Sequence, residues 1–297
     1  MKVLINAIGI SNSGGVVVLE KLILELVKAK KDSKFIFYVS LNSQISSLIE
    51  KYRDRSVLQF HIVRSNGYLA RLIFENFNLR KIIFQEGIDL IYNFSGSRQF
   101  FTNIPQLVKI HNLLFYSRNL DKFYRKKYKF QLWLKHVFFK RQILKIMLSK
   151  SRYVEIQSKH VITHLSDFVD MKQKKYYIKS DIDICDLHFC SPRKYDFSNT
   201  IKILYIVGPH FEYPHKNFLE FTKAMLILKN LKVDFEIHVT LSSSQLNKSD
   251  VWYSSLNPYT HFHGYITDLS NMESLFCDNT ILVSTSVVET LGLHVVE

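Results

Sequence analysis

The sequence predicts an α/β protein made of two Rossmann-like domains, each with a parallel sheet. Short apolar runs, typical of buried strands, alternate with longer helical stretches, and this order produces parallel sheets. The alternation starts again at residue 201, after a polar, proline-containing stretch that is typical of a connection. A chain of 297 residues is long enough for about two domains. We therefore expect an N-terminal domain over residues 1–187, a linker over 188–200 and a second domain over 201–297.

The N-terminal domain begins with a predicted strand (residues 2–10), turn (11–15) and amphipathic helix (16–31). Gly14 and Gly15 in the turn permit positive backbone torsions and close approach of a ligand to the main chain. The three spaced glycines of the dinucleotide-binding fingerprint do not occur in this turn. A turn that only joins strand to helix is the alternative interpretation.

The rest of this domain continues the alternation. Apolar runs predict strands at residues 35–41, 57–63, 89–94, 106–111 and 152–157, and helical stretches lie at 44–52, 68–85 and 158–169. His111 ends one of these strands, and ligands of open α/β sheets bind beyond the carboxyl ends of strands. A histidine at a strand end is also often structural.

The second domain repeats the pattern, with a predicted strand at residues 201–208, a loop at 209–216 and a helix through residue 228. Lys216 is the candidate cation for a diphosphate. A solvated lysine in the first helical turn is the alternative.

The last nine residues follow an apolar run at 280–284 and place two carboxylates, Glu289 and Glu297, around seven residues that include Gly292. A strand that opens through a glycine turn into a helix presents free N–H groups, which bind phosphate. Carboxylates on both sides can accept hydrogen bonds from the ribose and the hexose that flank the diphosphate of a nucleotide-sugar. Two solvated helix acids are the alternative.

Taken together, these segments resemble the retaining GT-B glycosyltransferases of family four, or glycosyl transferases group 1. The resemblance spans nearly the whole chain, but its assignable residues lie in the N-terminal glycine turn, 105–112, 201–216, 261–276 and 280–297. It implies a GT-B fold, in which two Rossmann-like domains turn their parallel sheets toward a cleft. It also implies a truncated, incomplete second domain, because the family continues beyond the position of Glu297.

The resemblance further implies a set of site residues. Glu289 would hold sugar hydroxyls, and His111 would orient the transferred sugar. The implied donor-binding residues are Gly14, Gly15, Gly208, Lys216, Ile266, Gly292, Leu293 and Glu297, the last on the ribose hydroxyls. The family usually has an arginine five residues before the lysine, and Phe211 stands in that place here.

The implied reaction moves a sugar from a nucleotide-diphosphate-sugar to a saccharide or lipid-linked acceptor with retention, in cell-surface polysaccharide synthesis. The family's front-face mechanism needs no catalytic base, and we expect no cofactor and no metal. Asp181 and Asp183 have the spacing of an Asp-x-Asp metal motif, but their place near the end of the first domain favours a loop role. A sugar-nucleotide epimerase of similar architecture and an inactive nucleotide-sugar-binding remnant are the alternatives.

Charge is distributed unevenly, with a net +19 over residues 1–195 and −5 over residues 196–297. Residues 118–152 hold 12 Lys and Arg and only Asp121 as an acid, interleaved with aromatic residues. Such a segment suits an anionic membrane surface, where each nearby Lys or Arg adds about 1 kcal/mol. A solvated basic helix with core aromatics is the alternative. We expect no nucleic-acid partner, because no helix-turn-helix, zinc-finger or RNA-binding signature occurs.

The three cysteines form neither a metal-type pair nor an even disulfide set, which favours a reducing cytosol. We identify no signal peptide and no apolar stretch near the ~18 residues of a membrane span. The expected location is cytoplasmic, with peripheral attachment to the inner face of the membrane as a hypothesis.

Overall fold

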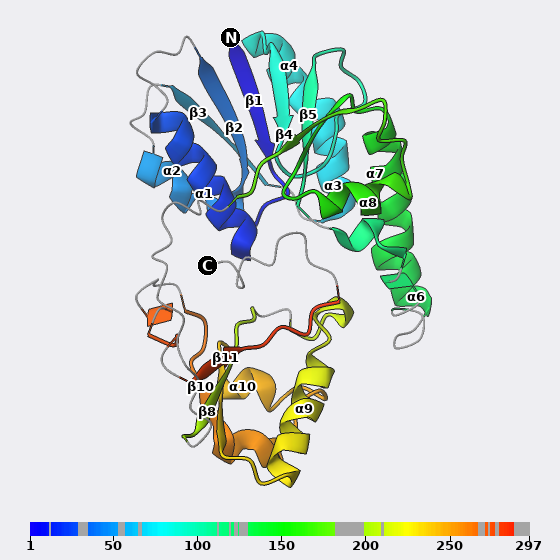
Figure 1. Ribbon diagram of the computed structural model, residues 1–297. Coiled ribbons are helices and arrows are strands. Elements are labelled where there is room, and N and C mark those ends of the chain that lie inside the picture. The colour runs from blue at the N-terminus through cyan, green and yellow to red at the C-terminus, as the bar shows by residue number, and fades with distance from the viewer. Residues whose placement is uncertain are drawn as a thin grey trace. The chain divides into compact units, whose positions relative to one another are not determined.

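Two parallel sheets, one of seven strands and one of four, form the framework of the computed structural model (Figure 1). They belong to two compact units, Met1–Ser117 with Gln131–Asp181, and Arg118–Phe130 with Ile182–Glu297. The structure describes residues 1–11, 13–28, 35–52, 57–64, 67–111, 113–118, 120–121, 124, 130–181, 199–208, 211–266, 271–272, 274–276 and 279–287. Because most of the predicted linker lies outside these ranges, the domain boundaries at residues 187 and 200 stay predictions.

The first sheet has the strand order β3-β2-β1-β4-β5-β6-β7, and every neighbouring pair is parallel. Its strands are β1 (Lys2–Ala7), β2 (Ile36–Asn42), β3 (Leu58–Val63), β4 (Leu90–Asn93), β5 (Gln106–Ile110), β6 (Tyr153–Ile156) and β7 (Lys175–Ile178). The predicted α/β class with a parallel sheet is confirmed. We did not predict β7, because all four of its residues are exposed and an exposed edge strand lacks a buried apolar pattern.

Helices connect these strands. They are α1 (Ser13–Lys28), η2 (Ser43–Ile45), α2 (Ser47–Tyr52), α3 (Tyr68–Ile73), the π-helical η3 (Phe74–Asn78), α4 (Leu79–Glu86), η4 (Leu113–Tyr116), α6 (Phe130–Trp133), the π-helical η5 (Leu134–Phe138), α7 (Phe139–Ser149) and α8 (His160–Ser166). In Figure 1, α1 and α2 lie beside β1 to β3, and α7 and α8 lie on the β5 side. The predicted helix over 68–85 is therefore interrupted by a π-helical turn, which a hydrophobic pattern does not reveal.

The turn predicted at residues 11–15 is wrong, because α1 already begins at Ser13 and contains both Gly14 and Gly15. Helical backbone has negative torsions, so positive φ is not the reason for these glycines. A Cβ at Gly15 would lie 3.3 Å from Cγ2 of Ile10. Gly15 therefore allows the first turn of α1 to pack closely on the chain that leaves β1.

The second sheet has the order β10-β9-β8-β11 and is also parallel throughout. Its strands are β8 (Ile201–Tyr205), β9 (Phe235–Val239), β10 (Thr260–Phe262) and β11 (Thr280–Leu282), and the helices are η7 (Pro214–Lys216), α9 (Phe218–Asn230), α10 (Ser243–Leu246) and η8 (Ser254–Tyr259). Alternate residues of β8 and β9, such as Ile203 and Ile237, share one buried cluster with Phe221 of α9. The side chains between them lie on the opposite face of the sheet.

Both sheets contain a point at which the strand order reverses. The chain leaves β1 toward β2 and later returns to β4 on the other side, and it leaves β8 toward β9 and returns to β11. Open parallel sheets bind ligands beyond the carboxyl ends of the strands at such points. The loops that follow β1, β4, β8 and β11 are therefore where the candidate site is sought.

Candidate functional site

In the second unit, hydrogen bonds join the loop after β8 to the loop after β11. The Thr285 hydroxyl donates to the carbonyl oxygen of Lys216 at 2.9 Å and lies 2.8 Å from the Tyr205 hydroxyl. The Val287 amide donates to the carbonyl oxygen of His215 at 2.8 Å. The segment that leads into residue 288 therefore runs beside the turn that carries Lys216. Glu289, Gly292, Leu293 and Glu297 themselves lie outside the described residues.

Lys216 is the last residue of η7, a single turn that Pro214 opens. Asn217 follows with a φ of 50°, a left-handed conformation that asparagine tolerates better than most residues. The chain turns there, and α9 begins at Phe218. Lys216 is half-buried and stands two residues before the first helical residue, at the positive end of the helix dipole.

Phe211, which stands where the resembled family has an arginine, belongs to the core. It is 4% exposed, and its ring meets that of Phe218 edge to face at 5.1 Å. This position therefore provides packing for α9 and no charge.

The other two donor-site predictions of this unit lie on the same edge of the sheet. Gly208 is exposed three residues after β8, and a Cβ placed on it would meet no atom within 4 Å. The loop before it is held by Thr240, whose hydroxyl accepts from the Val207 amide and donates to the Val207 carbonyl. Ile266 follows β10, the edge strand, after Gly264 with a φ of 70°.

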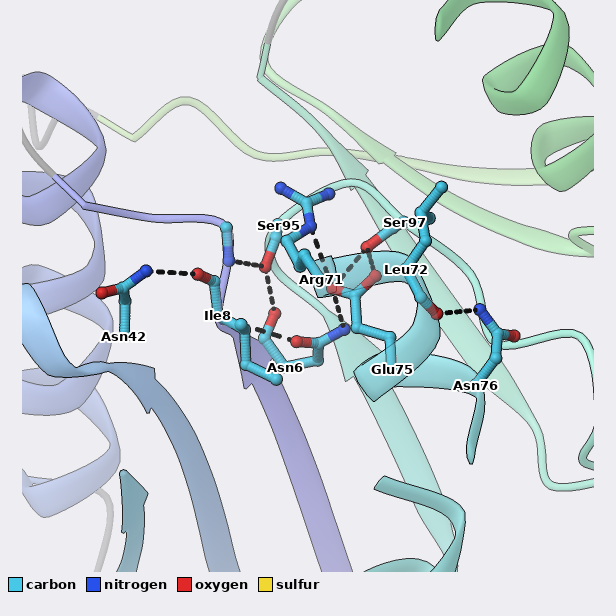
Figure 2. A network of polar contacts seen from close by, with 10 residues as sticks. Asn6, Ile8, Asn42, Arg71, Leu72, Glu75, Asn76, Ser95 and Ser97 are labelled. Carbon is cyan, nitrogen blue, oxygen red and sulfur yellow. Dashed lines mark hydrogen bonds and ion pairs between the residues drawn. The ribbon is translucent and has the colours of Figure 1, made fainter. Parts of the chain in front are cut away.

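At the reversal point of the first sheet, the buried carboxylate of Glu75 organises a polar network (Figure 2). Glu75 is 1% exposed, accepts hydrogen bonds from Asn6 Nδ2 (3.0 Å) and Ser97 Oγ (2.8 Å), and pairs with Arg71 Nε at 3.3 Å. It lies in the π-helical η3, a kind of turn frequent at functional sites. Ser95 closes the network, since its Oγ accepts from the Gly9 amide and donates to the Asn6 carbonyl.

Arg71 places a cation directly over the loop after β1. A Cβ on Gly9 would lie 2.1 Å from a terminal nitrogen of the Arg71 guanidinium and 2.8 Å from Cβ of Ser95, so a larger residue here would displace Arg71 and the loop after β4. The guanidinium also lies 5.5 Å from the Tyr68 ring centroid. We did not predict Arg71 and Glu75 from the sequence. Their i,i+4 spacing was the available signal, but it is common on helices.

His111 directly follows β5 and lies against Phe94. Its Nε2 is 2.7 Å from the carbonyl oxygen of Phe94, and the two rings meet edge to face at 4.7 Å. Burial, with the positive charge of Lys109 nearby, lowers the pKa of His111 to about 4. The imidazole is therefore neutral at pH 7, and since a carbonyl only accepts, Nε2 carries the proton.

Lys109 forms a buried ionic cluster with two acids. Its Nζ lies 2.6 Å from Glu155 Oε1 and 2.5 Å from Asp181 Oδ1, and all three side chains are at most 8% exposed. The Tyr92 hydroxyl donates to Glu155 and Gln157 Nε2 donates to Asp181. Asp181 lies in the bend after β7, which agrees with the predicted loop, and its carboxylate there is a buried ion-pair partner of Lys109. A lysine and a glutamate inside apolar strands were the signal for this cluster, but only the register pairs Lys109 with Glu155.

One group of side chains in the described residues has the composition of a metal site. Glu236, His238 and His261 each offer one ligand atom within 4.8 Å of the others. They lie on β9 and β10, which are on the opposite side of β8 from β11. We did not predict them from the sequence, although Glu-x-His and His-x-His at strand spacing were visible.

The basic segment at 118–152 is described in part. Trp133 and Val137 are buried, whereas Phe130, Phe139 and Ile146 are exposed. Its aromatics are thus divided between core and surface. Among the helices that the structure describes, none is both long and apolar enough to cross a membrane.

Comparison with known proteins finds similarity in structure only. The sequence matches no protein-family model and no curated protein. The structure is similar to the apo lipopolysaccharide outer core galactosyltransferase WaaB (TM-score 0.61, 12% identity, covering 99% of this chain and 77% of that one). It is also similar to TarM, with a TM-score of 0.58 and 12% identity over 99% of this chain and 82% of that one. A third similar structure is a glycosyltransferase from Rickettsia africae ESF-5, with a TM-score of 0.56 and 15% identity over 96% of this chain and 73% of that one.

At these identities the similarity concerns the fold, not the chemistry. It agrees with the two parallel sheets and their reversal points. The chain has the α/β fold of the GT-B glycosyltransferases.

Proposed function

We propose that this protein is a glycosyltransferase that moves a sugar from a nucleotide-diphosphate-sugar to a hydroxyl acceptor, with retention at the anomeric carbon. The observation that carries the proposal is the hydrogen bonding of Thr285 and Val287 to the turn of Lys216. It brings a cation, a helix N-terminus and the segment entering residues 288–297 to the reversal point of one parallel sheet. The similarity to WaaB and TarM supports the same conclusion.

In this proposal the main chemical task is to stabilise the leaving diphosphate. Lys216 and the N–H groups near Gly292 and Leu293 act on the charge that grows as the glycosidic bond lengthens. At Gly208 and Ile266 the nucleotide-sugar donor can approach the main chain. Glu289 accepts hydrogen bonds from the sugar hydroxyls, and Glu297 accepts them from the ribose hydroxyls. In the first unit, Gly14 and Gly15 contribute free N–H groups of the first turn of α1.

His111 acts in this proposal as a neutral, oriented imidazole. The Phe94 carbonyl fixes the ring, and the low pKa prevents a positive charge at neutral pH. A neutral imidazole carries one N–H, and since Nε2–H is donated to Phe94, the sugar hydroxyl is the donor to this ring in our proposal. We propose no metal for the transfer itself, and a chelator should leave nucleoside diphosphate release unchanged. Loss of release that a divalent ion restores would contradict this.

The donor site is tested by nucleoside diphosphate release from a panel of nucleotide-sugars, followed by titration of the best donor. We expect Lys216→Ala to reduce kcat/KM about 100-fold, the size of effect seen when one donor to a developing charge is removed. Lys223→Ala is the matched control, because Lys223 is an exposed lysine of α9 that pairs with the exposed Glu220 at 3.0 Å. Equal activity of the Lys216→Ala and Lys223→Ala proteins would reject the site.

We further propose a lipid-linked or saccharide acceptor at the inner face of the cytoplasmic membrane, as in cell-surface polysaccharide synthesis. The basic α7 presents Phe139 and Ile146 to solvent, and α3 with η3 presents Leu69, Ile73 and Phe77. The two helical segments are neighbours, since Lys140 lies 5.4 Å from the ring of Tyr68. Basic and apolar groups on one surface suit an anionic lipid headgroup layer.

Co-sedimentation with vesicles tests the membrane proposal. We expect binding to vesicles with anionic lipid and loss of binding in the Leu69→Glu, Ile73→Glu double variant. Ile227→Glu is the control, because Ile227 is 58% exposed on α9 of the other unit. Equal recovery in the supernatant with anionic and neutral lipid would reject membrane attachment.

A sugar-nucleotide epimerase of similar architecture is the second candidate, because such an enzyme would use the same diphosphate site. The structure is also similar to MnaA of S. aureus, solved with UDP (TM-score 0.51, 10% identity, covering 92% of this chain and 71% of that one). NMR of the donor without acceptor distinguishes the two. An epimeric sugar favours the epimerase, and diphosphate release that depends on an acceptor favours the transferase. Donor binding without either product would identify a nucleotide-sugar-binding remnant.

A further inference from the structure

Four polar side chains gather on the face of the second sheet that points away from α9. Phe235, Ile237 and Val239 of β9 enter the core, so Glu236 and His238 lie on the other face. The parallel register places His261 of β10 opposite His238. His263, two residues further along the chain, lies on the same side and meets the ring of His238.

The distances between these side chains match those within the shell of a single ion. Oε2 of Glu236 lies 3.4 Å from His238 Nε2 and 3.6 Å from His261 Nε2. In a tetrahedral site with bonds of about 2.0–2.1 Å, two ligand atoms are about 3.3 Å apart. The two distances to Glu236 exceed this separation by only a few tenths of an ångström, and all three ligand atoms lie within 4.8 Å of one another.

His263 has the position of a second-layer partner. Its Nε2 lies 3.0 Å from Nδ1 of His238, the nitrogen that does not face Glu236. A histidine that binds a metal through one nitrogen usually donates its other N–H to a neighbour, which fixes the ring. If His238 Nδ1–H donates to His263, the lone pair of Nε2 faces Glu236 Oε2.

The three histidine rings also lie together. The rings of His261 and His263 stack on that of His238, with centroids 4.7 and 5.2 Å away. Lys202 of β8 is the register partner of Glu236.

We propose that Glu236, His238 and His261 bind a divalent transition-metal ion such as Zn²⁺, with His263 holding His238 in place. Imidazole nitrogen with a carboxylate oxygen is a typical ligand set for zinc, and three protein ligands leave one position for water. The ion joins β9 to β10, a three-residue edge strand. Its role is therefore to fasten the edge of this sheet, and none of its ligands belongs to the proposed donor site.

The test uses the full chain, stripped with a chelator and free of nucleotide. Calorimetric titration with Zn²⁺ should show one equivalent bound, and Co²⁺ should give the intense visible absorption of a four-coordinate ion. Zn²⁺ should also raise the melting temperature, because it binds the folded state. Glu236→Gln and His261→Ala should each abolish the Co²⁺ spectrum, and His263→Ala should weaken binding about 10-fold, as expected for a second-layer partner.

His160→Ala is the matched control, because His160 and His164 form the other described histidine pair, with ring centroids 6.2 Å apart on α8. It should leave the Zn²⁺ titration unchanged. His261 is more than half exposed, so the His261→Ala protein should fold, which circular dichroism verifies. Absence of stoichiometric binding, or binding that survives in both Glu236→Gln and His261→Ala, would overturn the proposal. Because no nucleotide-sugar is used, this result is independent of the transferase assay.

Discussion

Replacing Lys109 with methionine should destabilise the first unit severely, although Lys109 touches no proposed substrate. Its ammonium group lies between Glu155 and Asp181, with all three side chains 8% exposed or less. Methionine has a similar length but no charge, so two carboxylates would remain buried without a cation. Removing one partner of a buried ion pair costs about 3–5 kcal/mol. For a unit of this size, that lowers the melting temperature by about 10 °C.

The assay is thermal and urea unfolding followed by circular dichroism, with two further variants. Adding Glu155→Gln and Asp181→Asn to Lys109→Met should recover part of the lost stability, because the unpaired charges are then removed. The exposed pair Lys223 and Glu220, 3.0 Å apart, provides the contrast: Lys223→Met should change stability by less than about 1 kcal/mol. If Lys109→Met unfolds like Lys223→Met, buried charge does not dominate here and the reasoning is refuted.

Three further predictions concern Glu75, His111 and Thr285. Glu75→Gln should lower stability by about 1–3 kcal/mol in urea titrations, since it loses the Arg71 pair and leaves donors of Asn6 or Ser97 poorly matched. Because the pKa of His111 is lower in the folded protein, the imidazole takes up a proton at a higher pH in the unfolded chain than in the folded one. The free energy of unfolding should therefore be constant above pH 7 and fall by up to about 3 kcal/mol between pH 6.5 and 4. If the His111→Gln protein had the same pH profile, this prediction would be contradicted. Thr285→Val should raise the KM for the donor several-fold while leaving the melting temperature within a few degrees, and an unaltered KM would separate this loop from the donor site.

Much of the architecture was predictable because parallel strands are buried on both faces. Such strands appear as continuous apolar runs, and β1 to β6, β8 and β11 all coincide with predicted runs to within a few residues at each end. Element ends were less predictable. The start of α1 at Ser13 depends on how Gly15 packs on Ile10, and no local preference of the sequence encodes that contact.

A site residue could be predicted only where a suitable side chain stands directly after a predicted strand. Lys216 follows β8 and precedes α9, so the order of elements alone brings it to the carboxyl edge of the sheet. The contact of Thr285 with Lys216 required the strand order, because β8 and β11 are far apart in the chain and become neighbours only when the sheet forms.

The fold class, the two series of strands and helices, and the segments that leave the ends of the strands could all be read from the amino-acid sequence. Which charges are paired could be seen only in the folded chain. Lys109 meets Glu155 and Asp181, and His238 meets His261, through sheet register and crossover. The local pattern of apolar residues shows which face of a helix or strand is buried. Which residue lies opposite another in a sheet depends on how strands that are distant in the chain align, and that alignment is set only when the whole domain folds.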